Sequence, residues 1–301
     1  MSQPAPVPSV TPTGKCGFVV LAGRPNAGKS TLLNALVGTK VAITSPRPQT
    51  TRYLIRGVVH RPEGQAVLVD TPGVFMKVSN KLTERVNQRL NEALEGIDLV
   101  VHVADPTRAA GPEERAVEHL ILKVPKPRIL AINKMDLADK PYLEDCRALA
   151  PRYDVVVEVS AWNGKGVPHL ADEIFKRLPT GPLFYEKFQV TDMTNEQWMS
   201  ELIREKVFLH TVEELPYHCA VEIEEATDRP RRDKRAPATI YIKANIITSA
   251  ERYRPMLLGE GGRRIRSIGQ AARKELEVAM NKKVFLELFV KVDDRWMERF
   301  E

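Results

Sequence analysis

The feature that most constrains the fold of this chain is a glycine-bounded loop, Gly23-Arg24-Pro25-Asn26-Ala27-Gly28-Lys29-Ser30, which matches the spacing G-x-x-x-x-G-K-[ST]. An apolar run, 18–22, precedes the loop, and a leucine-rich run with helical spacing, 31–37, follows it. A strand, this loop and a helix in that order predict backbone N–H groups that surround a phosphate chain. The segment therefore predicts a nucleotide-binding site. The alternative is a chance glycine loop at a strand–helix turn.

Individual residues of the loop have predictable roles. We expect Lys29 to reach the β- and γ-phosphates and the Ser30 hydroxyl to ligate Mg²⁺. Further along, Thr50 and Thr51 lie in a polar loop with two prolines. A threonine in such a loop can ligate Mg²⁺ while a γ-phosphate is present and let go after hydrolysis. The residues alone leave both threonines open, and an ordinary polar loop is the alternative. The remaining predicted phosphate-loop contacts are Gly23, Asn26, Ala27, Gly28 and Thr31.

A second short apolar strand, 66–69, runs directly into Asp70-Thr71-Pro72-Gly73. An aspartate at a strand end beside a phosphate loop can hold Mg²⁺ through water. The Gly73 N–H can contact the γ-phosphate, because no side chain blocks a close approach. We therefore expect Asp70 at the metal and Gly73 at the γ-phosphate.

The motif that selects the base is Asn133-Lys134-Met135-Asp136, which follows an apolar strand at 128–132. The Asp136 carboxylate can accept hydrogen bonds from N1–H and the exocyclic amine of guanine together. Adenine presents an acceptor at N1, so the same carboxylate would be left unpaired, which gives large selectivity. We expect Asn133 to brace the loop and the Lys134 stem to pack on the base. The predicted nucleotide is therefore GTP, and an ATP-using kinase or ATPase is disfavoured.

A further strand, 155–159, leads into Ser160 and Ala161, and the Ala161 N–H could bond the guanine carbonyl oxygen. Strands alternate with helices over residues 15–180. This alternation predicts a three-layer α/β domain with a parallel sheet and a ligand site at the carboxyl ends of its strands.

With these motifs in order, residues 15–180 resemble a translation-factor-class, Ras-like P-loop GTPase domain. The phosphate loop, Gln49-Thr50-Thr51-Arg52 and Asp70-Thr71-Pro72-Gly73 are similar to those of the Era family. The resemblance implies an enzyme that hydrolyses GTP to GDP with Mg²⁺, and it favours Thr51 over Thr50. Metal ligation is then assigned to Ser30, Thr51 and Asp70, and catalysis to Lys29, Thr51, Gly73 and Asn26.

Val74 stands where signalling GTPases of the Ras type carry a water-orienting Gln. A valine cannot orient or polarise water, so we expect slow intrinsic hydrolysis. In relatives with an Asn in the phosphate loop, that Asn ligates a K⁺ ion that stands in for an arginine finger. The resemblance thus suggests K⁺-stimulated hydrolysis through Asn26, and the alternative is that Asn26 only supports the tight turn.

The predicted second domain covers 193–301, after a flexible tail at 1–14, the first domain at 15–180 and a linker at 181–192. A short helix, Gly259-Glu260-Gly261-Gly262 and a longer helix follow one another there. Helix, G-x-x-G, helix is typical of KH modules, whose glycines let an RNA backbone approach closely. Behind an Era-like domain, it resembles the smaller α+β, type II KH domain of that family. The predicted RNA contacts are Gly259, Glu260, Gly261, Gly262, Arg263, Arg264, Ile265 and Arg266.

Charge supports an RNA-binding face in this half of the chain. Residues 229–283 hold 15 basic and 5 acidic side chains, whereas the whole chain has a net charge of +6. Such clustering is typical of a phosphate-binding surface. Glu260 departs from the pattern, because many KH loops carry a basic residue there. The basic loop Arg229–Arg235 is the alternative RNA site.

The resemblance implies a GTP-dependent switch that binds the 3′ region of small-subunit ribosomal RNA and acts with the small ribosomal subunit during its assembly. The alternative is a GTP-dependent regulatory module at the membrane or in cell-cycle control, with hydrolysis incidental. The three cysteines are far apart in the sequence, and no run of eighteen apolar residues occurs. These features favour a cytoplasmic protein, and peripheral association with the inner face of the cell membrane belongs to the alternative. We expect a monomer.

Overall fold

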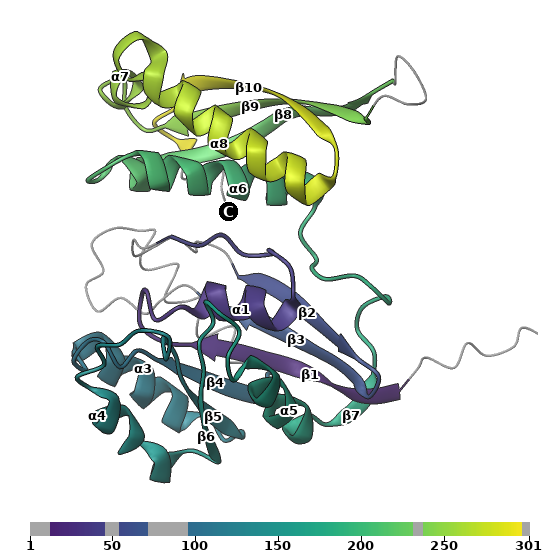
Figure 1. Cartoon of the computed structure of the whole chain (residues 1–301), viewed down its shortest axis with the longest axis vertical. Coiled ribbons are helices and arrows are strands. Elements are labelled where there is room, and N and C mark those ends of the chain that lie inside the picture. Colours follow the sequence, from purple (N-terminus) through teal and green to yellow (C-terminus); the bar gives the residue numbers. More distant parts are fainter. Residues whose placement is uncertain (1–12, 46–53, 72–95, 231–236, 297–301) are drawn as a thin grey trace, which may run out of the picture. The chain divides into compact units, whose positions relative to one another are not determined.

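The computed structural model describes residues 13–45, 54–71, 96–230 and 237–296 (Figure 1). The chain divides into two compact units. The first unit holds the described residues up to 41 and from 54 to 192. The second holds residues 42–45 together with the described residues from 193 onward.

A central sheet organises the first unit. Its strands are β1 (Thr13–Ala22), β2 (Ile55–Arg61), β3 (Gly64–Asp70), β4 (Leu99–Ala104), β5 (Arg128–Ile132), β6 (Val155–Glu158) and β7 (Thr180–Pro182). Their order is β2-β3-β1-β4-β5-β6, with β7 beside the start of β1. The strands β3, β1, β4, β5 and β6 are mutually parallel. Their carboxyl ends therefore meet at one edge of the sheet.

The prediction of a parallel sheet was wrong for β2 and β7, which run antiparallel to β3 and β1. A two-residue connection joins β2 to β3, and so short a connection can only form an antiparallel hairpin. β1 also begins at Thr13, inside the range that the sequence assigned to the tail, and Thr13 pairs with Pro182 of β7.

Helices cover both faces of this sheet. They are α1 (Lys29–Val37), α3 (Pro112–Lys123), α4 (Leu143–Arg147) and α5 (Val167–Arg177). Val117 of α3 packs with Val20 of β1. α1 packs on the other face, where its Leu33 lies against Gly57 of β2. Gly57 pairs with Leu68 of β3, and Leu68 pairs with Val19 of β1, so Gly57 and Val19 lie on the same face of the sheet. Adjacent residues of a strand point to opposite faces, so the predicted three-layer arrangement is confirmed.

The second unit is a smaller α+β domain, as predicted. Its elements in chain order are α6 (Asn195–His210), β8 (Cys219–Arg229), β9 (Thr239–Thr248), α7 (Tyr253–Leu258), α8 (Arg263–Met280) and β10 (Lys283–Val292). The sheet order is β10-β9-β8. β10 runs parallel to β9, and β8 runs antiparallel to it with an irregularity between Ile223 and Glu225.

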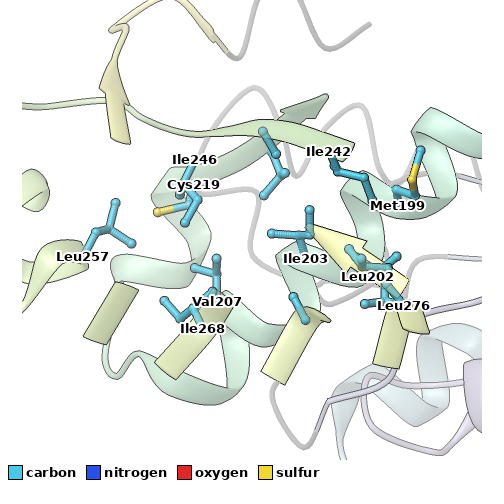
Figure 2. Packing of buried hydrophobic residues seen from close by; sticks show 14 of the residues in the cluster. Met199, Leu202, Ile203, Val207, Cys219, Ile242, Ile246, Leu257, Ile268 and Leu276 are labelled. Carbon is cyan, nitrogen blue, oxygen red and sulfur yellow. The ribbon is translucent and has the colours of Figure 1, made fainter. Parts of the chain in front are cut away.

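Side chains from all three helices and from the sheet form one apolar core in this unit (Figure 2). α6 starts with a capping box, in which the Thr194 hydroxyl accepts from the Gln197 N–H and the Gln197 side chain accepts from the Thr194 N–H. The apolar core packs α8, which begins at the glycine loop, against α6 and the sheet. Its buried members include Met199, Leu202, Ile203, Val207, Cys219, Ile242, Ile246, Leu257, Ile268 and Leu276.

Candidate functional site

The predicted phosphate loop connects β1 to α1. Gly28, the N-cap of α1, has a φ of 95°, and Asn26 has a φ of 63°, so two residues of the loop have a left-handed backbone. The Lys29 side chain folds back over the loop, and its Nζ donates to the carbonyls of Gly23 at 2.9 Å and Arg24 at 3.0 Å. Burial lowers the pKa of this ammonium group. The loop thus holds the buried Lys29 ammonium group against two of its own carbonyl groups, where a phosphate could replace them as partner.

The two described metal-ligand candidates lie side by side. Ser30 is in the first turn of α1, and Asp70 is the last residue of β3. The Ser30 hydroxyl donates to a carboxylate oxygen of Asp70 at 2.5 Å. A hydroxyl and a carboxylate are hard oxygen donors of the kind that Mg²⁺ prefers. This pair fits a magnesium ion at the mouth of the phosphate loop.

The base-recognition loop is joined to the phosphate loop through Asn133. Its backbone N–H donates to the carbonyl of Ala104 at the end of β4, at 2.8 Å. Its side-chain nitrogen donates to the carbonyl of Ala27 at 2.9 Å, and its side-chain oxygen accepts from the Ala161 N–H at 2.9 Å. One buried amide therefore connects three loops at the carboxyl edge of the sheet. This is the bracing role that the sequence predicts.

Asp136 is oriented by the loop after β6. The Ser160 hydroxyl donates to one Asp136 carboxylate oxygen at 2.6 Å, and Ser160 itself is fully buried. The Ala161 N–H, expected at the guanine carbonyl oxygen, instead donates to Asn133 in this structure. Its contact with the base stays a prediction.

Several predicted residues lie outside the described part of the chain. They are Thr50, Thr51, Gly73 and Val74. Of the basic loop Arg229–Arg235, only Arg229 and Pro230 are described.

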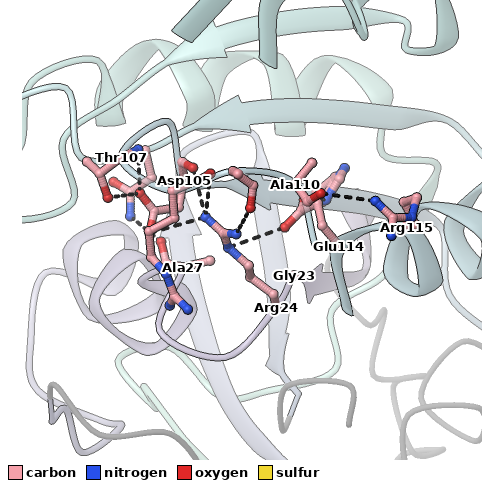
Figure 3. A network of polar contacts seen from close by, with 12 residues as sticks. Gly23, Arg24, Ala27, Asp105, Thr107, Ala110, Glu114 and Arg115 are labelled. Atoms are coloured by element: carbon pink, nitrogen blue, oxygen red, sulfur yellow. Dashed lines mark hydrogen bonds and ion pairs between the residues drawn. The ribbon is translucent and has the colours of Figure 1, made fainter. Parts of the chain in front are cut away.

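Two further residues connect parts of the site but were not predicted from the sequence, Arg24 and Asp105 (Figure 3). Arg24 occupies a variable position of the phosphate-loop motif, yet its side chain is only 5% exposed. Asp105 follows β4 and accepts from Lys134 Nζ at 2.7 Å. A charged residue inside a phosphate loop and an aspartate directly after a buried strand are weak signals that the sequence did contain.

The glycine loop of the second unit has an unusual backbone. Gly259, Gly261 and Gly262 all have φ between 58° and 74°. A Cβ on Gly259 would lie 2.8 Å from Cβ of Arg264, so no side chain fits there. Glu260 pairs with Arg263, which offsets the negative charge that Glu260 brings to this loop. The loop can therefore approach a phosphate backbone closely.

A groove of about 480 Å³ lies beside this loop, between α8 and β10. Ile265 and Arg266 line it, whereas Ile268 is fully buried in the core. Arg264 does not line the groove, and its guanidinium donates to the carbonyl of Met256. The lining of the groove therefore combines apolar and cationic side chains, which suits bases and phosphates. Its lining residues are Gly262, Ile265, Arg266, Gly269, Gln270, Arg273, Leu286 and Leu288.

Both units match known protein families. A family model described as 50S ribosome-binding GTPase matches residues 18–134, and one described as KH domain matches residues 214–297. The GTPase Era of Halothermothrix orenii is 42% identical over 287 residues, which are 95% of each chain. The GTPase Era of Heliobacterium modesticaldum is 37% identical over 290 residues, 95% of this chain and 94% of the relative.

Solved structures agree with these matches. An Aquifex aeolicus Era variant bound to GDP and AlF4⁻ has a TM-score of 0.85 and 35% identity, covering 95% of this chain and 96% of that one. A structure of Era in complex with MgGDPNP and nucleotides 1506–1542 of 16S ribosomal RNA has a TM-score of 0.85, 34% identity and the same coverage.

In the described part of the chain, none of the helices combines the length and the apolar character needed to cross a membrane.

Proposed function

Because the chain belongs to the Era family of GTPases, we propose that it is a GTP-hydrolysing switch that binds the 3′ region of small-subunit ribosomal RNA and acts in assembly of the small ribosomal subunit. The observation that carries the nucleotide part is the 2.9 Å hydrogen bond from Asn133 to Ala27, which joins the guanine motif to the phosphate loop. The groove between α8 and β10 supports the RNA part.

In this proposal, Lys29 contacts the β- and γ-phosphates with the ammonium group that now bridges two loop carbonyls. Ser30 and Asp70 hold Mg²⁺, with Thr51 as a third ligand. A bound Mg²⁺ would offset the negative charge of the phosphates. The Gly73 N–H contacts the γ-phosphate. Phosphoryl transfer depends mainly on such positioning and charge stabilisation, so the ordering of these groups is the main contribution of the protein.

Asp136 reads the guanine edge while Ser160 fixes the direction of its carboxylate. The Lys134 stem packs against the base, and its ammonium group is held by Asp105. Such buried polar pairing discriminates strongly against a base that cannot complete it.

For hydrolysis, we propose that Asn26 ligates a K⁺ ion, since Val74 cannot orient water. The φ of 63° at Asn26 supports the alternative equally, because asparagine tolerates a left-handed backbone. The variant Asn26→Gly separates the two readings, since glycine keeps this backbone and removes the ligand. The proposal predicts faster GTP hydrolysis in KCl than in NaCl for the natural chain and equal rates for Asn26→Gly. Equal rates for the natural chain, or persistent KCl stimulation in Asn26→Gly, would exclude this role.

The RNA part draws support from a relative whose structure contains nucleotides 1506–1542 of 16S ribosomal RNA. In the proposed complex, the glycine loop contacts the RNA backbone and unstacked bases lie along the groove. Arg266 and Arg273, which line the groove, contribute positive charge.

The test of the RNA part is a binding titration with two RNAs of equal length, the 3′ segment of 16S ribosomal RNA and a scrambled sequence. The chain loaded with a non-hydrolysable GTP analogue should prefer the ribosomal segment, and Arg266→Gln should weaken that binding several-fold. Arg115→Gln, on α3 of the other unit, is the control and should not change it. Equal binding of both RNAs would contradict the proposed target. Sequencing the RNA cross-linked to the GTP-bound protein in cells then identifies the target directly.

A further inference from the structure

The guanidinium group of Arg24 is buried against the loop after β4. Its Nη1 donates to the Ala109 carbonyl at 2.8 Å, and its Nη2 donates to the carbonyls of Asp105 at 3.0 Å and Arg108 at 3.1 Å. These contacts fasten the second residue of the phosphate loop to the adjacent strand end.

The Asp105 carboxylate connects this anchor to the base-recognition loop. Its side chain is fully buried, and one oxygen accepts from Lys134 Nζ at 2.7 Å and lies 3.7 Å from Arg24 Nη2. The other oxygen accepts from the Thr107 N–H at 3.0 Å and the Thr107 hydroxyl at 2.6 Å. Burial by itself raises the pKa of Asp105, but the hydrogen bonds from Lys134 and Thr107 hold that pKa below its usual range. The group is therefore a buried anion shared by two cations.

A second carboxylate contacts Arg24 from behind. One carboxylate oxygen of Glu114 lies 3.5 Å from Arg24 Nε (Figure 3). The other oxygen is hydrogen-bonded to His102 Nε2 at 2.8 Å. Among the described residues, Asp105 is paired with both Arg24 and Lys134, whereas Glu114 is paired with Arg24 and His102. This difference makes Glu114 a matched control for Asp105.

We propose that Asp105 is a positioning residue for the nucleotide, because it sets Lys134 at the base and Arg24 in the phosphate loop through a single carboxylate. This inference rests on the proposed guanine-nucleotide binding. With Lys134 held by its ammonium group, the stem lies in place before the base arrives, and less side-chain freedom is lost on binding. Changes in the base half of the site are thereby coupled to the phosphate half.

A double-mutant cycle on the full chain tests this role. GDP affinity is measured with a fluorescent GDP analogue for Asp105→Asn, Lys134→Met and the double variant. Methionine keeps an apolar stem over the base and removes the partner of Asp105. We expect Asp105→Asn to weaken GDP binding about tenfold in the natural chain. In the Lys134→Met background, the fold-loss caused by Asp105→Asn should be at least about threefold smaller. A merely structural role of Asp105 would give the same fold-loss in both backgrounds, and that result would overturn the proposal.

Glu114→Gln serves as the control, because it removes a negative charge beside Arg24 and leaves the partner of Lys134 in place. Its effect on GDP binding should be equal in the two backgrounds. If Asp105→Asn does not fold, Thr107→Val removes one hydroxyl partner of Asp105 and should show the same dependence on Lys134. A natural chain that binds ATP as well as GDP would refute the proposed nucleotide specificity instead. Equal losses in a natural chain that prefers GDP would refute only the role of Asp105.

Discussion

The side-chain nitrogen of Asn133 lies 2.9 Å from the carbonyl oxygen of Ala27, so the base-recognition loop donates directly to the phosphate loop. Gly28, the next residue along, faces the same amide, and a Cβ there would lie 2.3 Å from the Asn133 nitrogen. The absence of a side chain at Gly28 is therefore needed for contact between the two loops, in addition to its left-handed backbone.

The variant Gly28→Ala should therefore lose nucleotide affinity. Its methyl group collides with the Asn133 amide, and the two loops must separate. We expect GDP affinity to fall at least about tenfold in a titration with a fluorescent GDP analogue. Gly38→Ala is the control, because Gly38 has a similar φ of 81° but no atom within 4 Å of the added carbon. Both changes cost about 1–2 kcal/mol of backbone strain, and only Gly28→Ala also brings its methyl group against Asn133. Equal effects of the two variants on GDP affinity would therefore contradict the collision.

Asp136→Asn should shift the base preference from guanine to xanthine. The amide cannot accept from both guanine N–H groups, but it can donate to the carbonyl that xanthine carries at C2. GDP affinity should fall at least about 100-fold, and xanthosine diphosphate should become the tighter ligand. Isothermal titration calorimetry with GDP and with xanthosine diphosphate measures both affinities. Unchanged GDP affinity would remove the assignment of Asp136 to the base.

The double change Gly261→Asp with Gly262→Asp should abolish RNA binding. It adds two negative charges and two side chains where the backbone must approach phosphates. Gel-shift titration with the ribosomal RNA segment gives the readout. Asn281→Asp is the control, because it adds a charge at the far end of α8, also at a positive φ of 50°. If binding survives the double change, the RNA site moves to the loop that begins at Arg229.

Leu276→Ala should destabilise the second unit. Leu276 is fully buried on α8, and truncation of a buried leucine costs about 2–5 kcal/mol of unfolding free energy. Val278→Ala, on the same helix but 78% exposed, should change it by less than about 0.5 kcal/mol. Hydrogen exchange of the α6 amides under native conditions measures the effect without assuming that both units unfold together. Similar losses for both variants would contradict the packing in Figure 2.

Cys146 should react slowly with alkylating reagents at neutral pH. Burial, with a contribution from Glu114, raises the pKa of its thiol to about 11. Because the thiolate is the nucleophile, the rate at Cys146 should rise about tenfold per pH unit between pH 7 and 10. Mass spectrometry after iodoacetamide treatment measures it, with the denatured chain as the reference for an ordinary thiol. A pH-rate profile that levels off near pH 8.5 would contradict the raised pKa.

The nucleotide motifs and the fold class were predictable because each motif is a short run beside a strand. Lys29 must follow a glycine loop to reach phosphates, and Asp136 must end a base-reading loop, so local spacing carries both assignments. β2 was not predicted. Its segment includes Arg56, Gly57 and His60, and it lacks the continuous apolar run of a buried strand. It forms a strand because β3 provides an antiparallel partner.

By itself, the sequence determined that the chain carries a phosphate loop, a guanine-reading loop and a KH-type glycine clamp, since residues close together in the chain define each of them. Only the tertiary structure decided which of these residues share a partner. Asn133 reaches Ala27, 106 residues away, and the Asp105 carboxylate lies between Arg24 and Lys134. The physical reason is sheet order. Placing β1 beside β4 and β4 beside β5 brings three parallel strand ends to one edge, and neighbours along that edge are distant along the chain.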